Sequence, residues 1–461
     1  MDRISLRSRL FDFQPNSTLS YYFNKYARNA LLQVLRQGLT KGTLVIEDEQ
    51  GQYVFGETLE KNHSKAIHLK VRNEVMWGQV LLGHDLGFAE AYMQSHCDIS
   101  DLKGLLNLWL DNRDGLSALS STFSSVFQQV SHVINSTLFS QNLTMAKWSA
   151  EVSYDVSNDF MKAFLSKDMM YSAALWSDAE HGPRGDLTYG PTEGDLEAAQ
   201  QRKIQHFLNK ARLRKGDRLL EIGSGWGSMA IAAGRMGCQV DSITLSKEQK
   251  VYADKRIAAA GLSDTVRIHL CDYRELPRSF EHQFDACISC EMIEAVGHKN
   301  YGAYFKAIDW ALKRDRGTVV ISSTTQPESR YTEYQPEDFA RRYHWPNNFA
   351  PSPTSLLTAV QAAVPGGFVT YSVEDHGIHY CRTLREWNRR FQKNFEGDLI
   401  GYMQREYPFL KDPYRLEMFK RKWIYLFVYA EVGYARAYTS LHHFVFTRPV
   451  RVSVPQKRAK A

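Results

Sequence analysis

The sequence predicts an α/β fold with a mostly parallel, doubly wound sheet, preceded by a smaller α+β domain. Two observations predict the sheet: short apolar runs alternate with helical patterns, and closely spaced glycines follow one of these runs. This run, Arg218–Ile222, stops at Gly223, Gly225 and Gly227, and the helical spacing of residues 229–236 begins at once. A strand, a tight turn and a helix in this order are typical of one repeating unit of such a sheet.

The glycine-rich turn predicts a ligand site. Glycine lets a ligand approach the bare backbone at a helix N-terminus, where unpaired N–H groups and the helix dipole favour a carboxylate or a phosphate. A dinucleotide site would need the third glycine one position later and an acid at the end of the next strand. That strand ends at Thr244 instead, so S-adenosylmethionine (SAM) is the preferred ligand. A glycine turn without any ligand is the alternative.

Polar residues stand where three further predicted strands end. These strands and the residues that follow them are Val240–Leu245 with Ser246, Val266–Cys271 with Asp272 and Tyr273, and Phe284–Cys290 with Glu291–Glu294. The carboxyl ends of parallel strands share one edge of a sheet, so we expect a ligand to bind there. Ser246 is also placed to cap a helix that opens at Lys247, and Asp195 to cap one that opens at Leu196.

Composition and charge narrow the classes of function. The 461 residues, 43% of them hydrophobic, have room for two or three domains and a large core. No apolar run approaches the roughly 20 residues of a membrane span. The net charge of +6 comes without a basic stretch interleaved with aromatic residues, which argues against nucleic acid. Six scattered cysteines form no disulfide framework, so we expect a cytoplasmic protein.

Cys287 and Cys290 have the spacing of a metal or redox pair. They fall in a predicted strand, however, where an odd separation sends the two thiols to opposite faces. No second pair of cysteines completes a zinc site. The sequence therefore predicts two packing residues and no metal.

Changes of pattern divide the chain into four parts. They are an α+β domain at 17–114, an amphipathic connector at 115–150, a catalytic domain at 151–446 and a basic tail at 447–461. The first part contains a helical pattern at Ala27–Gln37, a hairpin within Gly42–Gly56 and a strand at Ala66–Val71. The tail holds Arg448 and four further basic residues without an acid, which suits a solvated tail or a peripheral contact with anionic lipid.

Several segments, in a fixed order along the chain, carry a family resemblance. Besides the glycine turn they are residues 154–159, 170–172, 196–201, 244–246, 272–274 and 294–301. From about Ala66 to about Phe446 the chain resembles the cyclopropane-fatty-acyl-phospholipid synthases and mycolic acid cyclopropane synthases. The resemblance implies a Rossmann-like class I SAM-dependent methyltransferase. It also implies that the N-terminal domain handles lipid or joins two subunits in a homodimer.

The resemblance further implies a set of residues that bind SAM. They are Tyr171, Ser172, Gly223, Gly225, Trp226, Gly227, Thr244, Gln249, Asp272 and Tyr273. The glycine turn would lie against the methionine part of SAM. The carboxylate of that part would accept hydrogen bonds from the hydroxyl groups of Tyr171 and Ser172. Gln249 would bind the ribose and Asp272 would accept from the adenine amino group.

The chemistry of an alkene acceptor predicts a dry aromatic pocket. An unactivated alkene is a poor nucleophile, so it must be pressed against the methyl group, and the resulting carbocation must be kept from water. Aromatic faces stabilise such a cation. The candidates are Tyr343, Trp345, Phe349 and Tyr380, the first three in a Pro-broken loop suited to cover a hydrophobic substrate.

The resemblance implies a catalytic base that is a bound bicarbonate, held partly by a Glu, a Tyr, a Cys and a His. Glu294 and Tyr380 occupy the Glu and Tyr positions and are the predicted catalytic residues. Ala173 and Ser322 stand at the Cys and His positions. These two differences argue against bicarbonate binding. The sequence therefore supports methyl transfer more strongly than it supports closure of the ring.

The sequence thus predicts SAM-dependent methyl or methylene transfer to the double bond of an unsaturated fatty-acyl chain in a phospholipid. The product would be a cyclopropane or a methyl-branched lipid, and the protein would be peripheral to membranes at most. One alternative is an N- or C-methyltransferase of a small hydrophobic metabolite, since a fold does not settle the substrate. Another is a lipid-binding protein whose catalytic site has decayed.

Overall fold

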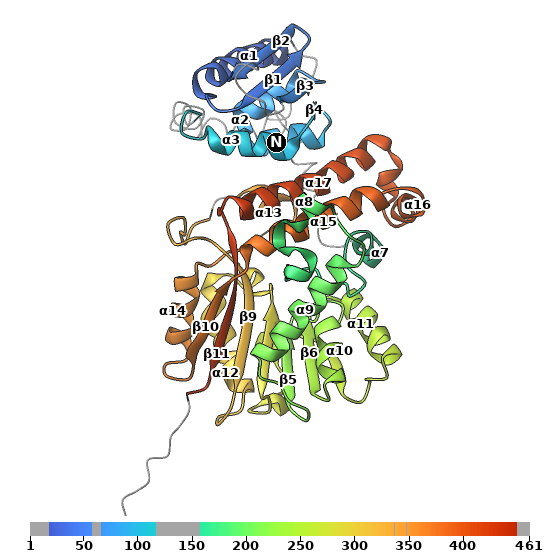
Figure 1. Cartoon of the computed structure of the whole chain (residues 1–461), viewed down its shortest axis with the longest axis vertical. Helices are drawn as coiled ribbons and strands as arrows, with labels where there is room; N and C mark the ends of the chain where they lie inside the picture. Colours follow the sequence, from blue (N-terminus) through green and yellow to red (C-terminus); the bar gives the residue numbers. More distant parts are fainter. Residues whose placement is uncertain (1–17, 58–65, 117–156, 336, 347, 450–461) are drawn as a thin grey trace, which may run out of the picture. The chain divides into compact units, whose positions relative to one another are not determined.

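The computed structural model divides the chain into two compact units (Figure 1). It describes residues 18–57, 66–116, 157–335, 337–346 and 348–449. The first unit comprises residues 1–157, 336–346 and 391–432, and the second comprises 158–335, 347–390 and 433–461. These units differ from the predicted division, because two segments of the predicted catalytic domain group with the N-terminal part. The predicted connector, apart from its first two residues, lies outside the described residues.

The first unit contains a small sheet and helices. Its elements are α1 (Thr18–Gly38), β1 (Thr43–Asp48), β2 (Gly51–Gly56), β3 (Ile67–Val71), α2 (Val75–Met93), β4 (Cys97–Ile99), α3 (Leu102–Asp111), α13 (Phe339–Tyr343), α16 (Gly397–Glu406), the 3-10 helix η7 (Pro408–Lys411) and α17 (Pro413–Ala435) as far as Val432. The strand order is β2-β1-β3-β4. The predicted hairpin and the strand that follows it are confirmed, because β1 pairs antiparallel with β2 and parallel with β3.

The second unit alternates strands with helices. Its elements are α7 (Asn158–Lys162), α8 (Gly185–Tyr189), α9 (Asp195–Lys210), β5 (Arg218–Ile222), α10 (Ser228–Arg235), β6 (Gln239–Thr244), α11 (Lys247–Ala259), β7 (Val266–Leu270), β8 (Ala286–Cys290), α12 (Tyr301–Ala311), β9 (Thr318–Thr325), α14 (Pro353–Ala363), β10 (Val369–Asp375), α15 (Gly377–Asn394) as far as Arg390, and β11 (Ser440–Thr447). Short 3-10 helices are η1 (Asp178–Glu180), η2 (Gly182–Arg184), η3 (Tyr273–Glu275), η4 (Arg278–Phe280), η5 (Ile293–Ala295) and η6 (His298–Asn300).

The large sheet has the predicted doubly wound topology. Its order is β10-β11-β9-β8-β5-β6-β7, and all strands from β9 to β7 run parallel. Only β11 breaks this direction, lying antiparallel between β9 and β10. The order of the chain reverses between β5 and β8. Their carboxyl ends therefore form the crevice in which such sheets bind ligands.

Helices cover both faces of this sheet (Figure 1), which is why its strands read as nearly continuous apolar runs. Successive residues of β5 enter different cores. Leu219 packs with residues of α9, α10 and α11, whereas Leu220 packs with residues of α12 and α14. Cys287 and Cys290 likewise contact different cores, which confirms the prediction that they point to opposite faces.

Two predictions about charged side chains are wrong. Helix α9 begins at Asp195 itself with Gly194 as its N-cap, and the Asp195 carboxylate instead accepts a hydrogen bond from buried Arg382 at 2.7 Å. Arg448 does not belong to a solvated tail, because its side chain is only 7% exposed and pairs with Asp309. In both cases a buried guanidinium recruits a carboxylate that the local sequence does not reveal.

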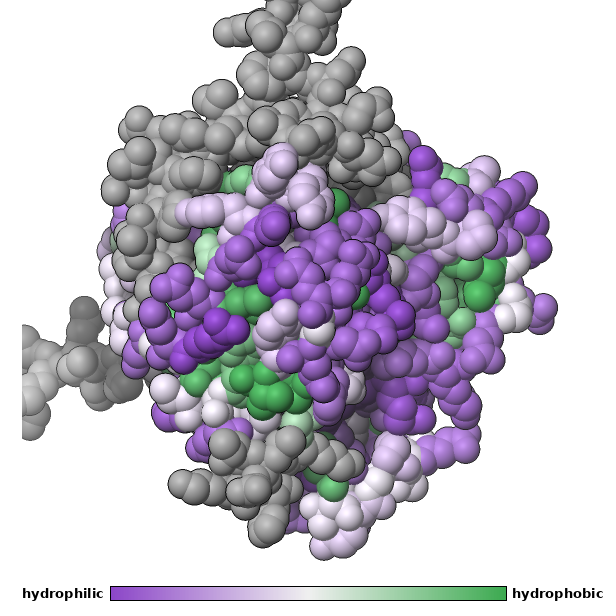
Figure 2. Space-filling view, turned by 90° about the horizontal axis from the view of Figure 1, so that it is seen from above, coloured by the Kyte–Doolittle hydropathy of each residue, from purple (hydrophilic) through white to green (hydrophobic). Residues whose placement is uncertain are grey.

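Among the described residues, no helix combines the length and the apolar character needed to cross a bilayer. On the face drawn in Figure 2, hydrophilic residues predominate and hydrophobic ones form small clusters between them. Membrane contact by the basic tail stays a prediction, since residues 450–461 lie outside the described part of the chain.

Candidate active site

The turn after β5 leaves room for a ligand against bare backbone. Gly223, Gly225 and Gly227 all have positive φ angles, of 96°, 47° and 83°. A side-chain carbon placed on Gly225 would have no atom of the described residues within 4 Å, whereas one on Gly223 would lie 3.4 Å from Met292. The turn therefore borders the segment after β8 and opens on one side. This open cradle at the N-terminus of α10 fits the methionine part of SAM.

The residues predicted to bind the other end of SAM lie around the strand ends. Thr244 donates a hydrogen bond to the side-chain oxygen of Gln249 at 3.0 Å, and Ser246 caps α11 as predicted. The carboxylate of Asp272 accepts two hydrogen bonds from the exposed guanidinium of Arg274. Tyr273 packs edge-on against Tyr304. Binding of the ribose and the adenine stays a prediction for Gln249 and Asp272.

The segment before α8 brings two further predicted residues to the site, together with one that the sequence did not suggest. The Ser172 hydroxyl accepts a hydrogen bond from the Lys203 ammonium group. Lys203 is buried in α9, and burial lowers its pKa. Tyr171 stacks on Trp387 with a centroid distance of 5.3 Å. Trp226 donates to the side chain of Asn158 at 2.6 Å. Lys203 was missed because it sits within an ordinary amphipathic helical pattern.

Glu291 is the second residue that the sequence did not single out. It follows β8 directly and has a φ angle of 50°, a left-handed conformation that is costly for a side chain of this size. Its Oε1 accepts a hydrogen bond from the backbone N–H of Ala173 at 3.0 Å. Its Oε2 accepts one from the Tyr380 hydroxyl at 2.7 Å. A strained residue whose carboxylate is held on both oxygens is typical of a functional site.

Glu294 lies one turn further on and has a different environment. Its Oε1 accepts a hydrogen bond from the backbone N–H of Thr324 at 2.5 Å, while its Oε2 is buried without a partner among the described residues. Burial, reinforced by the charge of Glu291, raises the pKa of Glu294 to about 8. Burial also raises the pKa of Glu291, but the Tyr380 hydroxyl and the Lys203 charge oppose this shift. The raised pKa favours a protonated Glu294 at neutral pH, while the hydrogen bond from Tyr380 and the charge of Lys203 favour the ionised form of Glu291.

Aromatic rings gather around the Glu291 carboxylate. The ring of Tyr380 lies 4.6 Å from that of Tyr434 and 6.0 Å from that of Trp387, measured between centroids. The Tyr434 hydroxyl is hydrogen-bonded to the Thr324 hydroxyl at 2.8 Å. Tyr380 was predicted; Tyr434 and Trp387 were not, because no local pattern marks them.

The three other predicted aromatic residues are not part of this cluster. Tyr343 and Trp345 belong to the first unit, where the buried Tyr343 donates a hydrogen bond to Glu90 at 2.5 Å. Phe349 belongs to the second unit and packs against His298, and its backbone N–H donates to the Glu294 carbonyl. Their contact with a substrate stays a prediction.

Comparisons with known proteins place this site in a family. The family described as mycolic acid cyclopropane synthetase matches residues 141–409. Tuberculostearic acid methyltransferase UfaA1 of Mycobacterium tuberculosis is 30% identical over 79% of this chain and 79% of its own length. Cyclopropane-fatty-acyl-phospholipid synthase of Escherichia coli is 30% identical over 75% of this chain and 83% of its own.

Solved structures agree with the observed fold. The cyclopropane synthase MmaA2 from Mycobacterium tuberculosis matches with a TM-score of 0.53 and 21% identity, covering 65% of this chain and 97% of that one. Coclaurine N-methyltransferase matches with a TM-score of 0.58 and 18% identity, covering 78% of this chain and 99% of that one. The family match and the two relatives, set beside a glycine cradle at the switch point of the sheet, lead to one conclusion: this chain belongs to the mycolic acid cyclopropane synthetase family and is a SAM-dependent methyltransferase.

Proposed function

We propose that the enzyme transfers the methyl group of SAM to a double bond of an unsaturated fatty-acyl chain carried by a phospholipid. The observation that carries this proposal is the pair of buried carboxylates, Glu291 and Glu294, beside the rings of Tyr380 and Tyr434. Methylation of an amine uses a lone pair and creates no carbocation. An alkene acceptor instead yields a cation that needs aromatic shielding, and then a base that removes a proton from carbon. The names of the two relatives, a tuberculostearic acid methyltransferase and a cyclopropane-fatty-acyl-phospholipid synthase, support a lipid acceptor.

Glu291 is the base in this proposal. Its carboxylate takes the hydrogen bonds of Tyr380 and of the backbone at Ala173. These are two of the positions at which the family resemblance implies contacts to bicarbonate. A carboxylate and a bicarbonate present the same pair of oxygen acceptors, so Glu291 supplies the base from the protein chain itself. This role accounts for the difference at Ala173, whose backbone N–H donates to Glu291, and it removes the need for bicarbonate.

SAM, when bound, supplies an electrophilic methyl group. A carbon–carbon bond would form between this methyl and one alkene carbon while the sulfur–methyl bond breaks, so that the donor would leave as the neutral thioether S-adenosylhomocysteine and the positive charge would pass to the neighbouring chain carbon. If Glu291 takes a proton from the added methyl directly, the ring closes. If a hydride first moves between the two chain carbons, loss of the same proton leaves a methylene branch. Either product delivers one proton to Glu291 and needs no reductant, whereas a saturated methyl branch would require one.

Methyl-labelled SAM and two kinds of vesicle test the acceptor. The purified enzyme is incubated with dioleoyl-phosphatidylglycerol vesicles or with saturated dipalmitoyl-phosphatidylglycerol vesicles. We expect label only in the unsaturated lipid, and lipid mass spectrometry should show the gain of one CH₂ unit. Incorporation should proceed equally in carbonate-free buffer and in buffer with added bicarbonate.

Three outcomes would contradict the proposal. Label in a hydrophobic amine and none in lipid would assign the enzyme to small-metabolite methylation. No label despite SAM binding by calorimetry would indicate a lipid-binding protein without activity. A strict requirement for bicarbonate would leave the lipid acceptor in place but remove Glu291 as the base.

A further inference from the structure

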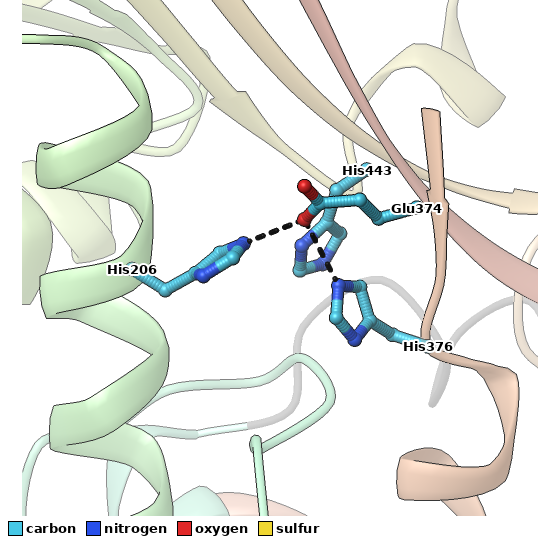
Figure 3. A group of neighbouring side chains, drawn as sticks. All are labelled: His206, Glu374, His376 and His443. Carbon is cyan, nitrogen blue, oxygen red and sulfur yellow. Dashed lines mark hydrogen bonds and ion pairs between the residues drawn. The ribbon is translucent and has the colours of Figure 1, made fainter. Parts of the chain in front are cut away.

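Three histidines and one glutamate converge at one edge of the second unit, in a place that the methyl-transfer site does not use. His206 projects from α9, Glu374 from β10, His376 from the residue that precedes α15, and His443 from β11 (Figure 3). One ligand atom from each side chain lies within 4.8 Å of the corresponding atoms of the others. Glu374 and His443 are register partners on neighbouring antiparallel strands, so their side chains share one face of the sheet.

Two of the separations between these atoms match a tetrahedral metal centre. The Nε2 atoms of His206 and His376 lie 3.1 Å and 3.4 Å from the same oxygen, Oε2 of Glu374. In a tetrahedral zinc site, with metal–ligand distances of 2.0–2.1 Å, neighbouring ligand atoms are separated by about 3.3 Å. The ring centroid of His206 lies 5.5 Å from those of both His376 and His443, which are 4.3 Å apart. The three rings come together from α9, from the residue before α15 and from β11 (Figure 3).

His443 provides an independent sign that a ligand is required. Its side chain is only 1% exposed, and its Nδ1 has no hydrogen-bond partner among the described residues. A buried ring nitrogen without a partner costs about 1–3 kcal/mol unless something binds to it. An imidazole coordinates a metal through an unprotonated ring nitrogen of this kind.

Hydrogen bonding alone explains the cluster less well. In that interpretation Glu374 accepts from His206 and His376 on one oxygen and from Lys210 on the other. This network satisfies the carboxylate but contributes nothing at Nδ1 of His443. The next histidine along, His379, does not belong to the cluster, because its Nδ1 accepts a hydrogen bond from the Trp176 backbone at 3.0 Å.

We propose that His206, Glu374, His376 and His443 bind one divalent transition-metal ion, with Zn²⁺ as the best match to three imidazoles and a carboxylate. Four protein ligands fill a tetrahedral shell, so the site is structural and has no open position for catalysis. It would tie α9, β10 and β11 to the start of α15, segments that are distant in sequence. His376 lies four residues before Tyr380, so the ion would also anchor the helical turn that carries this catalytic tyrosine.

Metal content tests the site directly. We would purify the untagged full-length protein from zinc-supplemented medium and measure bound metals by mass spectrometry. We expect about one zinc per chain in the wild type. After removal of the metal with a chelator, Co²⁺ should restore one equivalent and give the intense visible absorption of a tetrahedral cobalt centre. These measurements need no variant, so they do not depend on the folding of one.

Single substitutions then locate the ion. His206 is the most solvent-exposed of the three histidines, with a side chain that is 24% exposed. His206→Ala is therefore the substitution that should disturb folding least. We expect it to weaken zinc binding by more than about 100-fold, beyond the loss expected for an outer-shell partner. His269→Ala is the matched control, because His269 is a half-buried histidine bonded to Asp241 on another strand. It should retain one zinc per chain.

Two results would overturn the proposal. One is a wild-type protein that binds neither zinc nor cobalt in a one-to-one ratio. The other is an unchanged zinc affinity in both His206→Ala and Glu374→Gln when circular dichroism shows that these variants are folded. Either result would leave the hydrogen-bonded network around Glu374 as the explanation. The proposed methyl transfer would be unaffected, because no catalytic group is a ligand of the ion.

Discussion

The hydroxyl group of Tyr380 donates a hydrogen bond to the carboxylate of Glu291 at 2.7 Å, across a sequence separation of 89 residues. The contact joins the end of β8, next to the switch point of the sheet, to the first turns of α15. Tyr380 thereby orients the carboxylate while its ring, packed against Tyr434, faces the same site. One tyrosine thus couples the proposed base to the aromatic surface that would shield the cation.

Glu291→Gln should abolish turnover while leaving SAM binding intact. The amide keeps the size of the carboxylate and can still accept from the Ala173 backbone, but it cannot take a proton from carbon. We expect kcat to fall by about 10²–10⁴-fold, the contribution typical of a general base. Labelled-SAM turnover measures kcat, and calorimetry measures the affinity for SAM.

Glu275→Gln is the matched control for this variant. Glu275 is exposed in the turn after β7 and should not affect turnover. Activity within a few fold of wild type in Glu291→Gln would exclude Glu291 as the base. A parallel loss of SAM affinity would instead indicate that Glu291 shapes the cofactor site.

Tyr434 offers a separate test of the aromatic surface. Tyr434→Phe keeps the ring and loses only the hydrogen bond to Thr324, which costs about 1 kcal/mol of stability. Tyr434→Leu removes the ring. If the ring stabilises the cation by about 2 kcal/mol in this desolvated site, kcat should fall by roughly 30-fold in Leu and by only a few fold in Phe. Equal kcat values for the two variants at saturating SAM would show that the ring does not act on the cation.

The sheet could be predicted from the sequence because its signals are local. Strands β5 and β6 were each predicted from an apolar run that a glycine turn or a capping residue follows. Their predicted ends differ from the observed ends by about one residue at most. The grouping of 336–346 and 391–432 with the N-terminal unit could not be predicted in this way. It depends on contacts between segments far apart in the chain.

The candidate catalytic residues could be predicted from the sequence only in part, again because some of their contacts join distant segments of the chain. In the segment Glu291–Glu294 both acids look equivalent, and the family resemblance pointed to Glu294. What distinguishes Glu291 is its left-handed backbone and two partners more than eighty residues away. The histidine cluster was missed entirely, because its members extend from His206 to His443 and show no metal-binding spacing.

Gly225→Val should eliminate SAM binding. The added side chain would enter the open space beside the turn, and the φ angle of 47° disfavours a β-branched residue. Gly261→Val is a matched control: its φ angle is 68° and its surroundings are equally open, but it lies in the turn after α11. Both variants should lose some stability, and only Gly225→Val should lose affinity for SAM in calorimetry. Equal affinities would place the cofactor elsewhere.

Glu294 should make the stability of the protein depend on pH in a way that Glu294→Gln removes. The pKa of Glu294 is about 8 in the folded protein, above its ordinary value of 4.5. Between these two values the folded protein holds a proton that the unfolded chain has released. The free energy of unfolding therefore falls as the pH rises from about 4.5 to 8, and this contribution is constant above that window.

Thermal melting of wild type and Glu294→Gln at pH 5 and pH 8.5 measures this contribution. The glutamine mimics the protonated acid at both pH values. The difference between the Tm of the variant and the Tm of wild type should therefore be more positive at pH 8.5 than at pH 5. At about 2.1 cal/mol/K of unfolding entropy per residue, each kcal/mol corresponds to about 1 °C when the whole chain unfolds together. Buried Glu221, whose pKa is also raised to about 8, shifts stability in the same direction but is present in both proteins and cancels in the difference. If the gap in Tm between the two proteins were the same at both pH values, Glu294 would not hold the proton that the proposed division of roles assigns to it.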